Sequence, residues 1–194
     1  MLSEGFGDWT KVHFNAFTKA CAKYGRSEYE KLAKEIGKPA DDVRRYSETF
    51  WKLGEKHINE FERHVKNIEK GEKRLEEIQR LTSATKKLIM MFDDPWEELT
   101  FRNIGTQGRI FNAVEDRFLL CLTHVHGYGA WDLVRSSIRR CERFRFDFYL
   151  QSCSAETLGK RCENLMKAAE RELIEIERKK NVVDSTSGSG SGKR

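Results

Sequence analysis

Hydrophobic residues recur along this chain at steps of three and four positions, which predicts amphipathic helices. The first helix is expected over residues 10–24, a second between Ser27 and Gly37, and a third from Pro39 onward. The positions expected to face inward are Trp9, Phe14, Phe17, Cys21, Tyr29, Leu32, Ala33, Ile36, Val43, Tyr46, Phe50 and Trp51. Together these helices make one predicted three-helix module.

The same order of elements returns in the second half of the chain. Phe111 precedes a helix, a Gly-Tyr-Gly break follows, and Ser154 caps a third helix that runs to about Lys180. Inward positions in the first two of these helices are expected at Phe118, Leu119, Leu122, Val125, Trp131, Leu133, Val134 and Ile138. The repeat predicts an all-α fold with two similar three-helix modules.

Between the modules, residues 53–92 contain no proline and read as one long charged helix. Its apolar positions are Ile58, Phe61, Val65, Ile68 and Leu75, with Ile78 one residue out of register. Gly71 lies inside this stretch, where it weakens a helix by about 1 kcal/mol relative to Ala and permits a bend. The stripe fits either a coiled coil with another chain or a spacer docked partly on its own domains. Because the stripe is short and narrow, the spacer is favoured.

These patterns divide the chain into six expected segments. Residues 1–8 are a lead-in and residues 9–52 the first module. Residues 53–92 are the spacer helix, and residues 93–110 an irregular linker that starts at Asp93-Asp94-Pro95. Residues 111–180 are the second module, and residues 181–194 a Ser/Gly-rich disordered tail.

Composition adds few constraints and excludes several classes of site. Charged residues make up 35% of the 194 positions and the formal net charge is +5, which permits a polyanionic partner without requiring one. Three of the five cysteines fall on apolar helix faces, as expected for buried thiols in a reducing compartment. They are Cys21, Cys121 and Cys162. No nucleophile–base pair, phosphate loop, metal cluster, signal peptide or membrane span is visible, so we expect no catalysis, cofactor, metal or membrane partner in an intracellular chain.

Candidate chemistry lies on the predicted last helix. Its apolar side carries Leu158, Cys162, Leu165 and Ala169. Nearly opposite lie Lys160, Asn164, Lys167 and Arg171, with Arg161 on the flank and Arg139, Arg140, Arg143 and Arg145 shortly before the helix. Lysine and arginine in such an array bind phosphate without reading base sequence. The face is interrupted by Glu156, Glu163 and Glu170.

Two further groups of residues have weaker interpretations. The aromatic residues of the insertion before the last helix could stack on bases, but we expect them to form the core of that insertion. They are Phe144, Phe146, Phe148 and Tyr149. The third helix of the first module has an outer face of alternating sign, which suits a protein contact better than phosphate. Its candidate residues for a histone or partner contact are Asp41, Arg44, Arg45 and Glu48.

Four segments together resemble the SANT–spacer–SLIDE region of imitation-switch (ISWI) chromatin remodellers, both modules being Myb-like. They are GFGDWTKVHFNAFTKACAKYGR, NIEKGEKRLEEI, EDRFLLCLTH and FRFDFYLQSCSAETLGKRCENLM. The FRFDFYL insertion is the most specific, because ordinary Myb repeats lack it. The chain departs from the Myb pattern at Phe111, where Trp or Tyr is usual, and at Leu165 or Cys162, which replaces the third aromatic.

The resemblance implies a nuclear module that binds double-stranded linker DNA and nucleosomes without base specificity. In that family the contact supports nucleosome sliding and spacing by a separate ATPase motor, and the SANT module contacts histone tails or an accessory subunit. No G-x-x-x-x-G-K-[ST] loop is present, so no ATPase activity is expected of this chain. The alternative is a protein-interaction scaffold that binds histone tails or a remodeller subunit.

Overall fold

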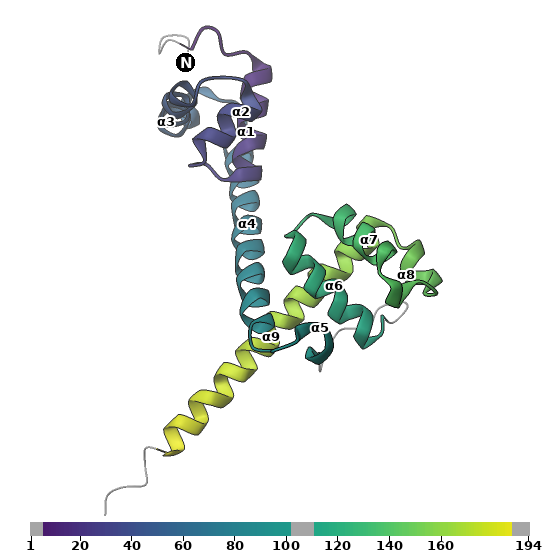
Figure 1. Ribbon diagram of the computed structural model, residues 1–194. Coiled ribbons are helices and arrows are strands. Elements are labelled where there is room, and N and C mark those ends of the chain that lie inside the picture. The colour runs from purple at the N-terminus through teal and green to yellow at the C-terminus, as the bar shows by residue number, and fades with distance from the viewer. Residues whose placement is uncertain (1–5, 102–110, 188–194) are drawn as a thin grey trace, which may run out of the picture. The chain divides into compact units, whose positions relative to one another are not determined.

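The computed structural model describes residues 6–101 and 111–187, with side chains described as far as residue 179. Within these ranges every regular element is a helix, which confirms the all-α expectation. The chain divides into two compact units, residues 1–78 and residues 79–194 (Figure 1). Each unit has its own hydrophobic core.

The first unit consists of α1 (Lys11–Tyr24), α2 (Tyr29–Ile36), α3 (Ala40–His57) and the beginning of α4 (Phe61–Ile89). Its core is built by the inward positions of the three short helices, and Trp9 stacks on Tyr46 with ring centroids 3.6 Å apart. Gly25 and Gly37 end α1 and α2 at positive φ, a conformation that glycine adopts without steric cost.

The expected single spacer helix is wrong at its beginning. Residues 53–57 continue α3, the chain turns at Ile58–Glu60, and α4 starts at Phe61. Glu60 has a φ of 56°, which α-helical backbone does not accommodate. Ile58 and Phe61 both pack against the core of the first unit. The physical reason for the break is therefore that the chain must reverse to return these two side chains to the same core.

Gly71 has a different role from the expected weak point. A Cβ atom at this position would overlap the carbonyl of Ala22 on α1, so the glycine allows α4 to lie against α1. One turn away from that contact, Arg26 binds Glu72 through two side-chain hydrogen bonds, of 2.8 and 2.5 Å. The first half of α4 is thus docked on its own unit, in agreement with the favoured interpretation of the spacer.

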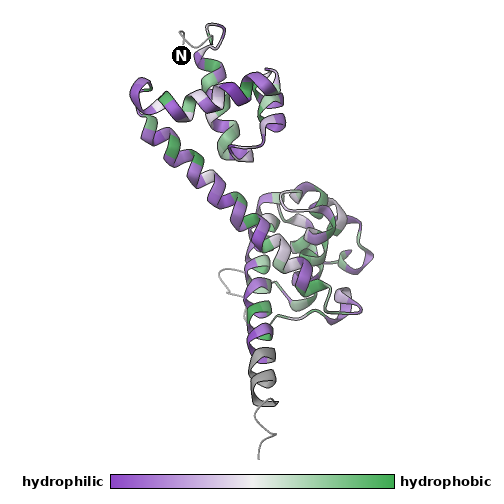
Figure 2. Cartoon of the chain, turned by 90° about the vertical axis from the view of Figure 1, so that its left-hand side faces the viewer, coloured by the Kyte–Doolittle hydropathy of each residue, from purple (hydrophilic) through white to green (hydrophobic). Residues whose placement is uncertain are grey.

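The second unit contains the rest of α4 and all later elements. These are α5 (Pro95–Glu98), α6 (Ala113–His126), α7 (Trp131–Arg140), the 3₁₀ turn η2 (Glu142–Phe144), α8 (Phe148–Ser152) and α9 (Ala155–Ser187). The core lies where α4, α6, α7 and α9 bring their buried leucines and isoleucines together, among them Leu81, Leu119, Ile138 and Leu158. Figure 2 shows hydrophobic positions spaced along these helices between hydrophilic ones.

The expected linker is partly a packed element. Leu99 is fully buried, and Arg117 donates hydrogen bonds to the backbone carbonyls of Trp96 and Glu97, so the segment as far as Phe101 belongs to the second unit. The remainder of the linker, residues 102–110, lies outside the described residues. The helix α9 continues past Lys180 to Ser187, and residues 188–194 of the expected tail also lie outside the description.

Buried thiols are confirmed at the three predicted positions. Burial raises the pKa of Cys21 and Cys162 to about 12 and that of Cys121 to about 11. Two predicted core positions are instead on the surface: Val125 is 63% exposed and Leu133 54%. In the parts of the chain that the structure describes, no helix combines the length and apolar character needed to cross a membrane.

Candidate nucleic-acid interface

The helix α9 has an apolar face and a polar face, because each kind of residue recurs about once per helical turn. Ser154 caps its first turn by accepting a hydrogen bond of 3.1 Å from the backbone of Thr157. The positions Leu158, Cys162, Leu165 and Ala169 are all buried in the core of the second unit. The opposite stripe is exposed along its whole length: Lys160, Asn164, Lys167 and Arg171. We call these four residues the α9 stripe.

Acidic residues near the α9 stripe are engaged by neighbours within the second unit. Glu156 pairs with Lys160 at 2.6 Å, and this hydrogen bond raises the pKa of Lys160. Glu163 accepts a hydrogen bond from the hydroxyl of Tyr128, and Glu170 pairs with Arg80 of α4 at 3.2 Å. The Glu156–Lys160 pair is open to solvent on both sides, so a phosphate can compete for the lysine.

Arg161 does not belong to the DNA-facing set, contrary to the sequence-based prediction. Its guanidinium is buried against the ring of Phe111, and two hydrogen bonds of 2.7 Å join it to the carboxylate of Asp116 on α6. The pair holds α9 on α6 instead of facing solvent. One signal for this pair is visible in the sequence: Asp116 stands beside the apolar positions of α6, where a charge is stable only with a partner.

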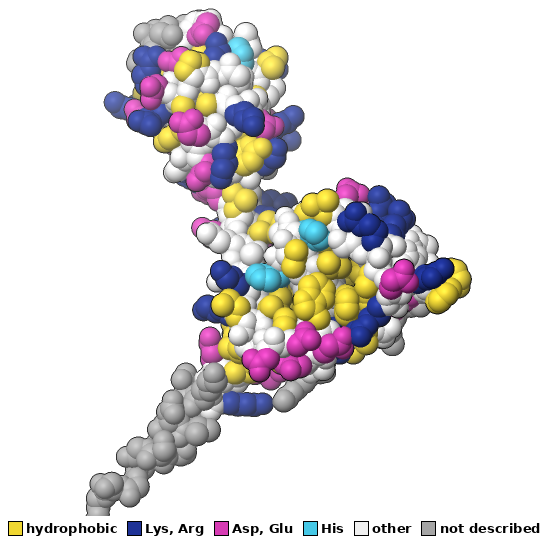
Figure 3. Space-filling view, viewed as in Figure 1, with side chains coloured by type: hydrophobic (Ala, Val, Ile, Leu, Met, Phe, Trp, Pro, Cys, Tyr) yellow, Lys and Arg dark blue, Asp and Glu magenta, His cyan; other side chains and the backbone are white. Residues whose placement is uncertain are grey.

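The four predicted arginines, two at the end of α7 and two in the insertion that follows it, are all exposed but differ in their partners. Arg139 and Arg140 are exposed at the end of α7, and Figure 3 shows Lys and Arg side chains gathered there. The Nε of Arg139 donates to the carbonyl of Gln151 at 3.2 Å. Arg145 is exposed, and its ion pair with Glu142 is long, at 3.9 Å. All three side chains are open to solvent.

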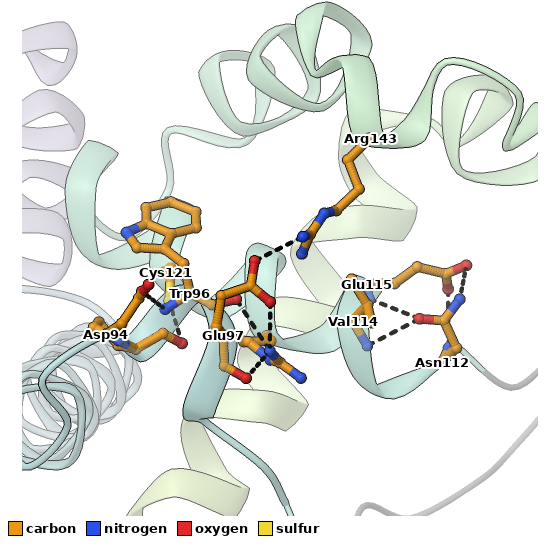
Figure 4. A network of polar contacts seen from close by, with 10 residues as sticks. Asp94, Trp96, Glu97, Asn112, Val114, Glu115, Cys121 and Arg143 are labelled. Atoms are coloured by element: carbon orange, nitrogen blue, oxygen red, sulfur yellow. Dashed lines mark hydrogen bonds and ion pairs between the residues drawn. The ribbon is translucent and has the colours of Figure 1, made fainter.

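Arg143 lies in a different environment, which the sequence analysis did not anticipate. Its guanidinium pairs with Glu97 of α5 at 2.7 Å (Figure 4). It also lies over the ring of Phe118. Glu97 also contacts Arg117, so one carboxylate links α5 to two arginines. No spacing rule connects Glu97 with Arg143, because their helices meet only in the folded unit. Arg143 thus pairs with α5, but its side chain is still 43% exposed and remains on the surface of the second unit.

The aromatic insertion is only partly the core that the sequence predicted. Phe144 is buried against Phe118, and Tyr149 packs on Phe111 with centroids 5.8 Å apart. Phe146 and Phe148 are 77% and 80% exposed, so for these two residues the prediction was wrong. The insertion is too short to enclose four rings, and η2 and α8 each direct one aromatic residue inward.

The outer face of α3 keeps its mixed charge. Asp41, Arg44, Arg45 and Glu48 are all exposed. Arg45 pairs with Asp42 at 2.5 Å, and the guanidinium of Arg44 lies 5.4 Å from the centre of the Tyr29 ring. Because cations there already have local partners, this face offers little net positive charge to phosphate. Among the described residues no group of three His, Cys, Asp or Glu side chains is placed to hold a metal ion.

Comparison with known proteins places this geometry in a family. The SLIDE family model matches residues 62–173. An Arabidopsis thaliana ISWI chromatin-remodeling complex ATPase, CHR17, is 35% identical over 178 residues, which cover 91% of this chain and 17% of the relative. The human SWI/SNF-related matrix-associated actin-dependent regulator of chromatin subfamily A member 1 is 32% identical over 189 residues, covering 94% and 18%. The yeast ISW2 ATPase is 30% identical over 192 residues, covering 96% and 17%.

The chain thus spans less than a fifth of the length of these curated relatives. The part shared with them is the all-helical region described above, which in its described residues carries no ATPase lobes. The family match includes all of α4 except Phe61, the insertion and the whole α9 stripe. The chain therefore belongs to the SLIDE family of imitation-switch chromatin remodellers, as the sequence resemblance indicated.

Proposed function

We propose that the second unit binds duplex DNA through its phosphate backbone, without base specificity, and that this DNA is the linker emerging from a nucleosome. The observation that carries the proposal is the α9 stripe, where Lys160, Lys167 and Arg171 are exposed on one face of a helix whose other face is buried. Residues 160–171 cover about 16 Å of helix, enough to meet several phosphates. The same surface on a nuclear remodeller would support nucleosome sliding and spacing by an ATPase motor.

Electrostatics favours this surface over the others of the second unit. Of the glutamates flanking the α9 stripe, Glu156 and Glu170 are paired with Lys160 and Arg80, which reduces their repulsion toward phosphate. Glu163 accepts a hydrogen bond from the hydroxyl of Tyr128. Arg139, Arg140 and Arg145 add exposed cations at the end of α7 and in the insertion. By contrast, acidic side chains gather near α5, where Figure 3 shows a row of Asp and Glu. That side of the unit is expected to repel DNA.

The proposal is tested by charge reversal on the α9 stripe. The variant Lys167→Glu/Arg171→Glu should bind a mixed-sequence duplex more weakly. The slope of log affinity against log salt should also become shallower, by about 1.8 for two lost phosphate contacts. The matched control is Lys34→Glu/Lys52→Glu, which changes the net charge equally on exposed helices of the first unit. Equal losses in both variants would mean that only net charge matters and would refute the assignment.

Linker recognition is tested with nucleosomes that carry or lack extra DNA. The wild-type chain should prefer the nucleosome with a linker, and the α9-stripe variant should lose that preference. The second candidate function, a scaffold for histone tails or a remodeller subunit, rests on the mixed-charge face of α3 formed by Asp41, Arg44, Arg45 and Glu48. Unchanged DNA binding by the α9-stripe variant would favour this second function.

A further inference from the structure

Two phenylalanine rings stand in solvent on the short segment between α7 and α9. Phe146 is 77% exposed and Phe148 80%. Figure 3 shows a hydrophobic tip beside α8, with a basic side chain next to it. Neighbouring aromatic rings in water mark a surface that a partner covers, whereas a single exposed apolar residue needs no such explanation.

The segment that carries the two rings is anchored. Phe144 and Leu150, on either side of it, are buried in the core of the second unit. The side-chain amide of Gln151 donates to the carbonyls of Ile138 and Phe144, at 3.4 and 3.0 Å. The carboxylate of Asp147 caps α8 by accepting from the backbone of Leu150 at 2.9 Å. The rings are therefore presented by a fixed turn, and little ordering entropy remains to oppose binding.

The charges around the tip indicate which partner it fits. The guanidinium of Arg145 lies 5.4 Å from the centre of the Phe146 ring, and its ion pair with Glu142 is long and open to solvent. Arg139 and Arg140 are exposed at the end of α7, just before the insertion. Arg139, Arg140 and Arg145 outnumber the nearby Glu142 and Asp147, which makes a basic histone tail an unfavourable occupant. They fit an anionic surface that has an apolar recess between its charges.

We infer that Phe146 and Phe148 enter the minor groove of the same duplex that the α9 stripe binds by its phosphates. The inference rests on the proposed function and specifies the contact at that site. The minor groove has phosphates along both edges, which arginines can bind. Sugars and base edges lie between the phosphates, and phenylalanine rings can pack against them. Apolar side chains inserted there partly unstack base pairs and bend the duplex, and they read deformability instead of a base code.

The experiment compares Phe146→Ala/Phe148→Ala with Val125→Ala/Leu133→Ala, a control pair of exposed hydrophobic residues in the same unit. Affinity for a mixed-sequence duplex is measured over a range of salt, and bending by energy transfer between dyes at the duplex ends. The phenylalanine variant should bind about ten- to hundred-fold more weakly at every salt concentration, with an unchanged salt slope and an unbent duplex. The control should bind and bend DNA as the wild type does.

The outcomes separate this inference from the proposed function. If the phenylalanine variant binds and bends DNA as the wild type does, groove entry is overturned. The two rings would then be assigned to a contact with a protein, and the proposed phosphate contact would be unaffected. Groove entry is also overturned if the phenylalanine variant binds more weakly but the wild-type protein does not bend the duplex. If the wild-type chain shows no salt-dependent DNA binding, the proposed function fails and the inference fails with it. Circular dichroism melting of both double variants shows whether these exposed positions leave the fold intact.

Discussion

The replacement of Arg161 by methionine distinguishes two roles for this residue: the DNA contact that the sequence predicted and the buried ion pair that the structure shows. If Arg161 contacted DNA, losing it would weaken binding and leave the fold intact. In the structure its side chain is 9% exposed and that of Asp116 is 3% exposed, and two hydrogen bonds of 2.7 Å join them. Methionine fills a similar volume but leaves the Asp116 carboxylate buried without its counter-ion. The expected effect is therefore on stability.

The magnitude follows from the depth of the pair. Two unit charges about 4 Å apart attract by about 4 kcal/mol at an effective dielectric constant of 20. Breaking a buried ion pair by removing one partner costs about 3–5 kcal/mol, since the remaining charge stays desolvated. Replacing both partners, in Asp116→Leu/Arg161→Met, should restore most of the stability, because a well-packed apolar pair often matches a buried ion pair.

Amide hydrogen exchange is the appropriate assay, because it reports on the stability of each of the two units separately. Arg161→Met should lower protection in α6 and α9 by about a hundred-fold or more, since each factor of ten corresponds to about 1.4 kcal/mol. Protection in α1 to α3 should stay at the wild-type level and serves as the internal reference. The salt slope of DNA binding should not change for the folded protein.

Two results would refute this reasoning. One is wild-type protection in α6 and α9 of Arg161→Met, which would mean that the pair adds nothing to the second unit. The other is a salt slope that becomes shallower by about 0.9 while protection is retained, since that is the signature of one lost phosphate contact. The second result would return Arg161 to the DNA-binding set.

Two further predictions concern the first unit. Gly71→Ala should destabilise it by about 1–3 kcal/mol, because a methyl group there overlaps the Ala22 carbonyl. Helix propensity alone predicts a gain of about 1 kcal/mol, so the sign of the change in a denaturant titration decides between them. The hydrogen bond from Arg26 lowers the pKa of Glu72, so the pair stabilises the unit at neutral pH and is lost as the pH falls below about 4.3. The stability difference between wild type and Glu72→Gln should therefore vanish at low pH, and a constant difference from pH 7 to pH 3 would contradict it.

Periodicity was sufficient where a helix has one buried and one exposed face. On α9 the apolar positions Leu158, Cys162, Leu165 and Ala169 all lie in the core, and the stripe opposite is exposed. Burial of the hydrophobic face is the main contribution to the packing of such a helix, so the spacing of its apolar residues determines which side faces the core. The order of α1, α2 and α3 in the first unit, and of α6, α7 and α9 in the second, follows from the same signal combined with caps at glycine and serine.

Periodicity failed where the chain reverses without a breaker residue. Ile58 and Phe61 continue the apolar spacing of a helix, yet the backbone leaves the helical region at Glu60 between them. Either a straight helix or a turn satisfies that local pattern, and only the shared core decides. The expectation of a weak point at Gly71 failed for a related reason. Glycine weakens an isolated helix, but here the absence of a side chain lets α4 lie close to α1.

Arg161 and the pair Phe146 and Phe148 reverse the usual expectation, since the charge is inside and the rings are outside. Both reversals have one physical basis: burial is decided by the partner an element meets, and an amino-acid type sets only the cost. Arg161 meets Asp116 from α6, and this carboxylate makes a buried guanidinium tolerable. The two rings stay 77% and 80% exposed within the described part of their unit, although burying each would be favourable by about 2 kcal/mol. Covering these two rings with a second molecule would therefore stabilise a complex. For this reason we expect the loss of both rings to weaken DNA binding more than the loss of any single lysine.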